Sequence, residues 1–329
     1  MTRELACADS SVRILRLEDM APMRTLFESV FSQPLSAEMM EYKYGGGRGL
    51  SLGLFEGDAL VAHCGIFPRD FLLFGNFRRI PQFGDLMVAP AARGSLRRKL
   101  SPFFRIITAA QLCLGGKDNS ERLFFGFPSG RAMAVGERLG LFAEVTAIKA
   151  LEWPAASVPR VSLVAPLPSQ EALREPRLRD AADTLWEAMA EDLADMVVGV
   201  RDAKYLHQRF MTHPRIAYHA FMLQSRWRKR PLGIFILRPQ GDCWELVDWV
   251  APREVMPAVI EKARQIVGVS GGKRMTTWIS DSHAELLATP DCRELATEFR
   301  IPVRGDSSPT EIALLKKRWW LTAGDTDYR

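Results

Sequence analysis

A strand that leads through a tight turn into a basic segment is the feature that most constrains how this chain folds. Residues 83–88 (FGDLMV) predict a short strand, and residues 89–92 (APAA) predict a turn broken by Pro90. Arg93 follows, and a helix is predicted from about residue 96 to residue 113. A helix N-terminus after such a turn points unpaired N–H groups to one side, which suits a phosphate. The alternative is a surface loop followed by a solvated helix face.

Two motifs in the first 150 residues resemble those of a known family. The string from Val88 to Gly94 (VAPAARG) is similar to the acyl-CoA-binding motif of the GNAT N-acetyltransferase superfamily, which reads V-x-P-x-x-R-G-x-G. Residues 124–142 (FFGFPSGRAMAVGERLGLF) resemble the later strand–helix unit of that family. The two motifs occur in the family's order and at about its separation. The resemblance implies an α/β (α+β) fold with a mixed, mostly antiparallel sheet flanked by helices.

The length of 329 residues suits two domains. We expect an N-terminal GNAT-like acyl-thioester-binding domain at 1–155, a Pro-rich linker at 156–180 and a second domain at 181–329. The second half repeats the predicted order of helices and strands coarsely, as in tandem GNAT-like bacterial proteins. Pro252 is not followed by R-G-x-G. We therefore interpret the second domain as a degenerate GNAT-like domain.

The resemblance also implies a function and a set of binding residues. The chain is expected to transfer an acetyl or longer acyl group from acyl-CoA to a small-molecule or peptide amine held between its two halves. The acyl carbonyl is expected to meet a backbone amide of the central strand, at Leu86, Met87 or Val88. The pyrophosphate is expected to meet the amides of Arg93, Gly94, Ser95, Leu96, Arg97 and Arg98.

Two departures from the family pattern leave alternatives open. Leu96 stands where the family has its second loop glycine, so the donor can instead be an acyl carrier protein, whose acidic surface would face Arg97, Arg98 and Lys99. Gly136 stands where the family often has a tyrosine that protonates the leaving thiolate. The second alternative is therefore a catalytically inactive binding or regulatory protein with the same fold.

Two residues are candidates for the general base that acyl transfer to an amine requires. Asp85 lies on the predicted central strand, near the expected position of the amine. His63 lies on a neighbouring predicted strand. The alternative for Asp85 is an exposed strand residue, and for His63 a structural histidine.

Composition indicates which locations, bound metals and partners to expect for this chain. No apolar run reaches the roughly 20 residues of a membrane span, and the first 20 residues show no apolar signal core, so we expect a cytoplasmic protein. The five cysteines form no CxxC pair, and the histidines have no ligand spacing, so we expect neither a disulfide framework nor a metal. The net charge of +5 comes partly from short basic clusters in no recognisable nucleic-acid module, so a nucleic-acid partner is not favoured.

Overall fold

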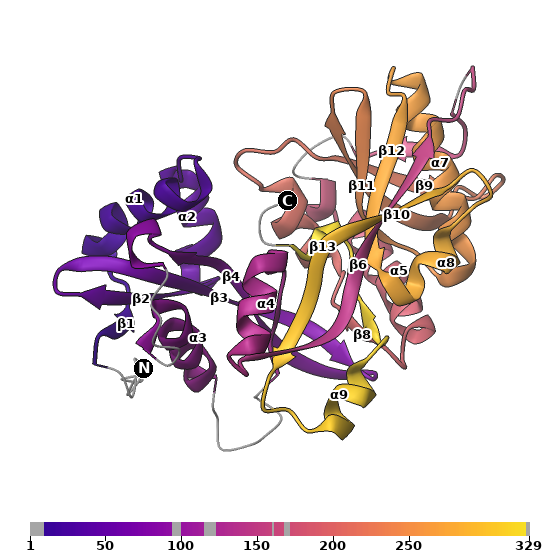
Figure 1. Cartoon of the computed structure of the whole chain (residues 1–329). Coiled ribbons are helices and arrows are strands. Elements are labelled where there is room, and N and C mark those ends of the chain that lie inside the picture. The colour runs from indigo at the N-terminus through magenta and orange to yellow at the C-terminus, as the bar shows by residue number, and fades with distance from the viewer. Residues whose placement is uncertain (1–9, 94–99, 115–122, 160, 168–171, 327–329) are drawn as a thin grey trace. The chain divides into compact units, whose positions relative to one another are not determined.

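The computed structural model describes residues 10–93, 100–114, 123–159, 161–167 and 172–326 (Figure 1). Within these residues the strands form two seven-stranded sheets in which most neighbours are antiparallel, and helices pack on both sheets. The predicted fold class, a mixed α/β fold with mostly antiparallel sheets flanked by helices, is confirmed.

The first sheet is built mainly from the N-terminal part of the chain. Its main path is β1 (Val12–Ile14), β2 (Leu50–Glu56), β3 (Ala59–Leu73), β4 (Asn76–Val88) and β5 (Phe125–Gly126). The far end of β3 pairs with β8 (Val197–Gly199), which pairs in turn with β14 (Trp319–Trp320).

Strands β3 and β4 form one long hairpin, so the strand predicted at 83–88 begins earlier in the chain, at Asn76. Phe74 and Gly75 at the turn both have positive φ, 52° and 75°. Two central residues with positive φ define a type I′ turn, whose twist matches that of the flanking strands. The turn therefore suits the long strands on its two sides.

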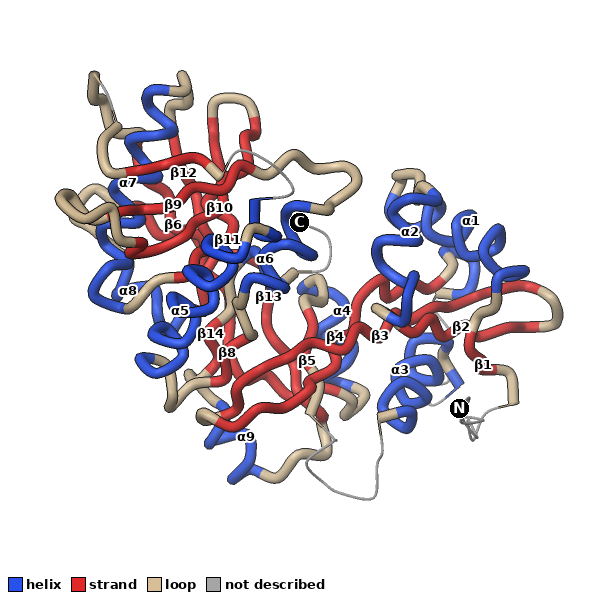
Figure 2. The backbone as a smooth tube through the Cα atoms, turned by 180° about the vertical axis from the view of Figure 1, so that it is seen from behind, coloured by secondary structure: helices blue, strands red, loops and turns tan. Residues whose placement is uncertain are grey.

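Helices cover both faces of this sheet (Figure 2). Helices α1 (Met20–Phe31) and α2 (Ala37–Tyr44) pack on one face, where Met23, Leu26 and Met40 are buried. Helices α3 (Pro102–Cys113) and α4 (Gly130–Arg138) pack on the other face. Ser36 caps α2, because its Oγ accepts a hydrogen bond from the Met39 N–H at 3.2 Å.

The predicted start of the basic helix, about residue 96, lies outside the described residues, as do all of residues 94–99. Helix α3 begins at Pro102, and Ser101 Oγ caps it by accepting a hydrogen bond from the Phe104 N–H at 3.3 Å. Proline suits the first helical position because it needs no N–H partner there. The Ser-Pro pair is therefore the local signal for the start of α3.

The second sheet is built from the C-terminal part of the chain. Its order is β13 (Arg293–Arg304), β6 (Phe142–Pro154), β12 (Arg274–Ser280), β11 (Cys243–Val250), β10 (Pro231–Gln240), β9 (His219–Gln224) and β7 (Val164–Pro166). Helix α7 (Met256–Val269) connects β11 to β12, which pair in parallel. The other helices of this part are α5 (Pro176–Asp192), α6 (Ala203–Leu206), α8 (Ala284–Leu287) and α9 (Pro309–Leu315).

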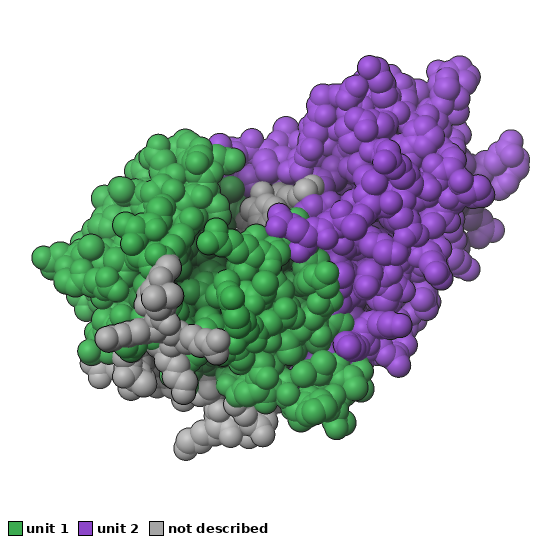
Figure 3. All heavy atoms as spheres, viewed as in Figure 1, with its two compact units in different colours: residues 1–69, 79–145, 299–314 green, residues 70–78, 146–298, 315–329 purple. Residues whose placement is uncertain are grey.

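The chain divides into two compact units (Figure 3). Unit 1 contains residues 1–69, 79–145 and 299–314, and unit 2 contains residues 70–78, 146–298 and 315–329. The predicted linker at 156–180 contributes β7 and the first turn of α5 to unit 2. The return of the chain to unit 1 at 299–314 was not predicted, and the functions expected of the predicted domains stay predictions.

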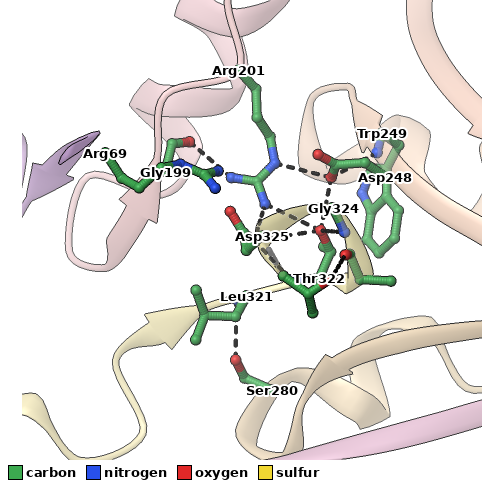
Figure 4. Close-up of polar contacts among 12 residues, drawn as sticks. Arg69, Gly199, Arg201, Asp248, Trp249, Ser280, Leu321, Thr322, Gly324 and Asp325 are labelled. Atoms are coloured by element: carbon green, nitrogen blue, oxygen red, sulfur yellow. Dashed lines mark hydrogen bonds and ion pairs between the residues drawn. The ribbon is translucent and has the colours of Figure 1, made fainter. Parts of the chain in front are cut away.

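In unit 2, a C-terminal segment lies between the ends of β11 and β12 (Figure 4). The parallel pairing of these strands ends at Leu246↔Thr277, although both strands continue. On one side, the Ser280 N–H donates to the Leu321 carbonyl at 3.1 Å. On the other side, the Thr322 hydroxyl donates to Asp248 Oδ1 at 2.9 Å. The segment therefore fills the space between the two diverging strands.

A fully buried arginine fixes this segment. Arg201 Nε donates to Asp248 Oδ1 at 3.0 Å, and Arg201 Nη2 donates to Asp325 Oδ2 at 2.6 Å. Tyr205 donates from its hydroxyl to Asp248 Oδ2 at 2.7 Å. Burial alone would lower the pKa of Arg201, but the two carboxylates outweigh it and raise the pKa. The guanidinium therefore stays charged and ties the C-terminal segment to β11.

Asp248→Asn is expected to lower the free energy of unfolding by about 3–5 kcal/mol, because it leaves a buried guanidinium with one of its two charge partners removed. Denaturant titration measures the change. The control is Asp195→Asn, whose partner Arg318 is half-exposed, and which is expected to cost less than about 1 kcal/mol. Equal losses in the two variants would contradict the structural role given to Arg201.

Candidate functional site

Strand β4 extends beyond the end of its neighbour β5. The two strands pair in parallel through Gln82↔Phe125 and Phe83↔Gly126. Strand β5 ends at Gly126, whereas β4 continues to Val88. Residues 84–88 of β4 therefore lie past the end of β5, and their edge on that side is outside the β4–β5 ladder.

A bulge reverses the side-chain alternation of β4 at this point. Phe83, Leu86 and Val88 all pack with the cluster under α3, whereas Met87 packs with α1 and α2. In a regular strand the residues at 83 and 86 would face opposite sides. One extra residue, inserted at a bulge, accounts for the observed pattern. Asp85 has a positive φ, 45°, which marks the position of this irregularity.

The carboxylate of Asp85 is buried against the C-terminal end of α2. It accepts a hydrogen bond from Lys43 Nζ at 2.5 Å and one from the Tyr44 hydroxyl at 2.6 Å. Burial would raise the pKa of Asp85, but the Lys43 ammonium and these hydrogen bonds outweigh it and hold the pKa below its usual value. Asp85 is therefore ionised and paired, and the predicted alternative of an exposed strand residue does not apply.

His63 on β3 is joined to the same bulge. Its Nδ1 lies 2.8 Å from the Asp85 carbonyl oxygen, and its Nε2 lies 2.6 Å from Ser51 Oγ. A carbonyl only accepts, so Nδ1 carries the proton and Nε2 accepts from the Ser51 hydroxyl. Burial lowers the pKa of His63. The imidazole is therefore neutral near pH 7, and both ring nitrogens are hydrogen-bonded.

The structure thus brings together the two predicted side chains, Asp85 and His63, and adds three that the sequence analysis missed: Lys43, Tyr44 and Ser51. One signal was available for Lys43. It stands three residues after the buried Met40, on the inward side of α2. A lysine on a buried helix face implies a carboxylate partner.

At the end of β4, the backbone N–H of Val88 points away from β3. The Ala89 N–H donates to the Val61 carbonyl of β3 at 2.8 Å, so the alternation of the strand directs the Val88 N–H to the opposite side, past the end of β5. Arg93 Nε donates to the Val88 carbonyl at 3.0 Å. The predicted phosphate-binding residues Gly94, Ser95, Leu96, Arg97 and Arg98 lie outside the described residues, as does Lys99.

The position expected for a tyrosine acid is closed by packing. A Cβ atom added at Gly136 of α4 would overlap the ring of Phe142. No larger side chain fits there without moving that ring. The departure noted in the sequence is therefore part of the packing of the core under α3 and α4.

Two further properties bear on the class of site. Among the described side chains, no cluster of three or more His, Cys, Asp or Glu residues is arranged to hold a metal ion. No helix in the described ranges is long and apolar enough to cross a bilayer.

Comparison with known structures places this fold in a class. A probable N-acyltransferase of unknown function from Enterococcus faecalis superposes with a TM-score of 0.66 at 15% identity, covering 92% of this chain and 73% of that chain. A GCN5-related N-acetyltransferase from Anabaena variabilis gives a TM-score of 0.60 at 15% identity, covering 89% and 72%. N-Myristoyltransferase of Saccharomyces cerevisiae with bound myristoyl-CoA gives 0.54 at 8% identity, covering 90% and 78%. The overall fold is thus of the GNAT-like class.

A family model matches the N-terminal part of the chain. Residues 11–132 match the model described as an acetyltransferase (GNAT) domain. This part of the chain is therefore similar to a GNAT domain, in agreement with the two motifs, and acyl transfer is the general class of reaction that such a domain supports. A search of curated proteins found no match. The expected tandem arrangement of two GNAT-like halves stays a prediction.

Acidification is expected to destabilise the protein partly through His63. The pKa of His63 in the folded state is lowered, so the unfolded chain, with its pKa of about 6.5, binds the proton first. Stability is therefore lost as the pH falls below about 6.5. Urea unfolding between pH 8 and pH 5 should show a shallower dependence for His63→Gln than for the wild type.

The matched control for this measurement is His219→Gln, which changes an exposed histidine and is expected to leave the dependence unchanged. Parallel curves for the wild type and His63→Gln would contradict a buried neutral imidazole.

Gly136→Ala is expected to cost about 1–3 kcal/mol, because the added methyl group overpacks the Phe142 ring. A double-mutant cycle with Phe142→Leu tests the cause, since the smaller side chain makes room. The double variant should lose less stability than the sum of the two single variants. Simple additivity would show that the two residues do not compete for the same space.

Proposed function

We propose that this protein is an N-acyltransferase that moves an acetyl or longer acyl group from acyl-CoA to an amine. The observation that carries the proposal is the end of β4: a bulged strand that continues past β5 and leads directly into the VAPAARG turn. A thioester arm can lie along such a strand edge and form backbone hydrogen bonds with it. The bound myristoyl-CoA of the yeast neighbour supports donors longer than acetyl-CoA.

In this proposal the amides of β4 polarise the thioester. The Val88 N–H points past the end of β5, and by alternation so does that of Leu86, whereas Met87 points toward β3. A backbone N–H fixed in place needs no rearrangement to stabilise the oxyanion that forms when the amine attacks. The C–S bond then breaks, the amide bond forms, and the thiolate of CoA takes up a proton. Arg93, together with the amides of Gly94, Ser95, Leu96, Arg97 and Arg98, is proposed to bind the pyrophosphate.

The buried pair of Lys43 and Asp85 is proposed to hold the bulge rather than to transfer protons. A carboxylate whose pKa is held low by an adjacent ammonium is a weak acceptor for the proton of an amine. The general-base role of Asp85 therefore stays a prediction, and the contacts of its carboxylate disfavour that role. Both ring nitrogens of His63 are hydrogen-bonded and the side chain is buried. Its role as a general base therefore also stays a prediction that these contacts disfavour. The expected position of the amine between the two halves also stays a prediction.

One observation favours the alternative of a catalytically inactive acyl-CoA-binding protein. Phe142 closes the Gly136 position against any acidic side chain, so the thiolate would have to take its proton from another group or from water. This alternative predicts binding of acyl-CoA without turnover. The other alternative, an acyl carrier protein donor, predicts turnover with acylated carrier protein and none with acyl-CoA.

Val88→Pro is expected to lower kcat/KM for acyl-CoA by roughly 100- to 1,000-fold, because it removes one carbonyl-polarising N–H. The affected N–H points away from β3, so the β3–β4 ladder survives the substitution. Thiol release measured with acetyl-CoA, a long-chain acyl-CoA and a panel of amines gives the rate. Val88→Ala, which keeps the N–H, should retain most of the activity.

Binding is measured on the same variants by calorimetric titration. Arg93→Ala is expected to weaken acyl-CoA binding about tenfold, the effect of losing one charge-assisted hydrogen bond to a phosphate. Arg24→Ala, which removes an exposed arginine from α1, is the matched control. Unchanged binding in both Val88→Pro and Arg93→Ala would contradict the proposed site. Binding that responds to the variants without turnover toward any amine would favour the inactive alternative.

A further inference from the structure

The hairpin that joins β9 to β10 in unit 2 presents five consecutive exposed residues, 226–230, with the sequence RWRKR. Four of the five are cationic, and the fifth, Trp227, is 86% exposed. Six of the other seven tryptophans are buried, and Trp244 is half-buried. An exposed indole among four cations is the exception among the tryptophans of this molecule.

The tip is an ordered structure. The Ser225 N–H donates to the Arg230 carbonyl at 2.9 Å, and the Arg230 N–H donates to Ser225 Oγ at 3.0 Å. Lys229 supplies the positive φ, 52°, that the turn needs. The Arg226 guanidinium lies 5.2 Å from the centre of the Trp227 ring, within the range of a cation–π contact. The turn therefore presents the indole and the four cations together at the end of one hairpin.

This combination has a specific chemical complement. Tryptophan concentrates at the headgroup level of bilayers, where its ring is half in an apolar and half in a polar environment. Lysine and arginine beside an anionic leaflet are attracted to its surface potential. Arginine also forms paired hydrogen bonds to phosphate oxygens. A nucleic-acid site would more commonly spread its cations along a groove with several stacking aromatics, whereas this tip offers one indole at a single point.

We propose that the 226–230 tip docks on the surface of an anionic phospholipid bilayer, with the Trp227 indole at headgroup level and Arg226, Arg228, Lys229 and Arg230 on lipid phosphates. The contact is peripheral, since it uses one hairpin and no spanning segment. It does not depend on the proposed acyl transfer, because every residue named belongs to unit 2.

The test is co-sedimentation of the full-length protein with vesicles, one set of phosphatidylcholine alone and one of equimolar phosphatidylcholine and phosphatidylglycerol. Binding is expected only to the anionic vesicles and is expected to weaken as salt is raised. Arg228→Gln with Lys229→Gln should weaken it about thirtyfold, since each cation near such a surface contributes roughly a fivefold factor.

The control removes the same charge elsewhere in unit 2. Lys316→Gln with Lys317→Gln changes two exposed lysines, and Lys317, like Lys229, has a positive φ. This variant should bind vesicles as the wild type does. An equal loss in both double variants would show attraction by net charge alone and would overturn the proposal.

Trp227 gives an independent optical readout. Because six of the other tryptophans are buried and Trp244 is half-buried, iodide should quench mainly Trp227, and Trp227→Phe should remove most of the quenchable fluorescence. Anionic vesicles should protect that fluorescence from iodide. Vesicle binding that leaves Trp227 fully quenchable would overturn the proposed orientation. Retention on duplex or single-stranded nucleic acid, with no retention on anionic vesicles, would assign the tip to a different partner.

Discussion

The ion pair between Lys43 and Asp85 is the interaction on which the architecture of the first sheet depends. A bulge near the C-terminal end of β4 turns the Asp85 carboxylate toward α2, and a buried carboxylate is tolerated only with a charged partner. Lys43 at the end of α2 is that charged partner, and the Tyr44 hydroxyl donates a second hydrogen bond to the carboxylate. The same bulge sets which side chains of residues 86–88 face α3 and so fixes the direction of the backbone beyond it.

The two sheets share one feature of their strand pairing. Each contains a parallel pair of strands connected through a helix, β4 with β5 and β11 with β12. Strand β4 continues past the end of its pairing with β5, and both β11 and β12 continue past the end of theirs. In unit 2 the resulting space holds residues 321–325, fixed by Arg201. Because residues 321–325 fill this space, it is closed to an acyl donor, in agreement with the missing R-G-x-G after Pro252. The acyl donor is therefore expected at β4.

Local signals in the sequence predicted much of the fold. The strand at 83–88 and the turn after Val88 both follow from short-range chemistry. Strand β13 was missed because its outward residues are charged and its buried ones, such as Ile301 and Val303, come only at its end. The bulge at Asp85 and its partner Lys43 are separated by 42 residues, so only tertiary packing brings them together.

A crystal structure with a non-hydrolysable acyl-CoA analogue would test the proposed donor site on β4 most directly. The acyl carbonyl oxygen is expected about 3 Å from the N–H of Leu86 or Val88, with the pantetheine arm along residues 84–88. The pairing of Lys43 with Asp85 is expected to be unchanged. An analogue bound between β11 and β12, with residues 321–325 displaced, would contradict a donor site on β4.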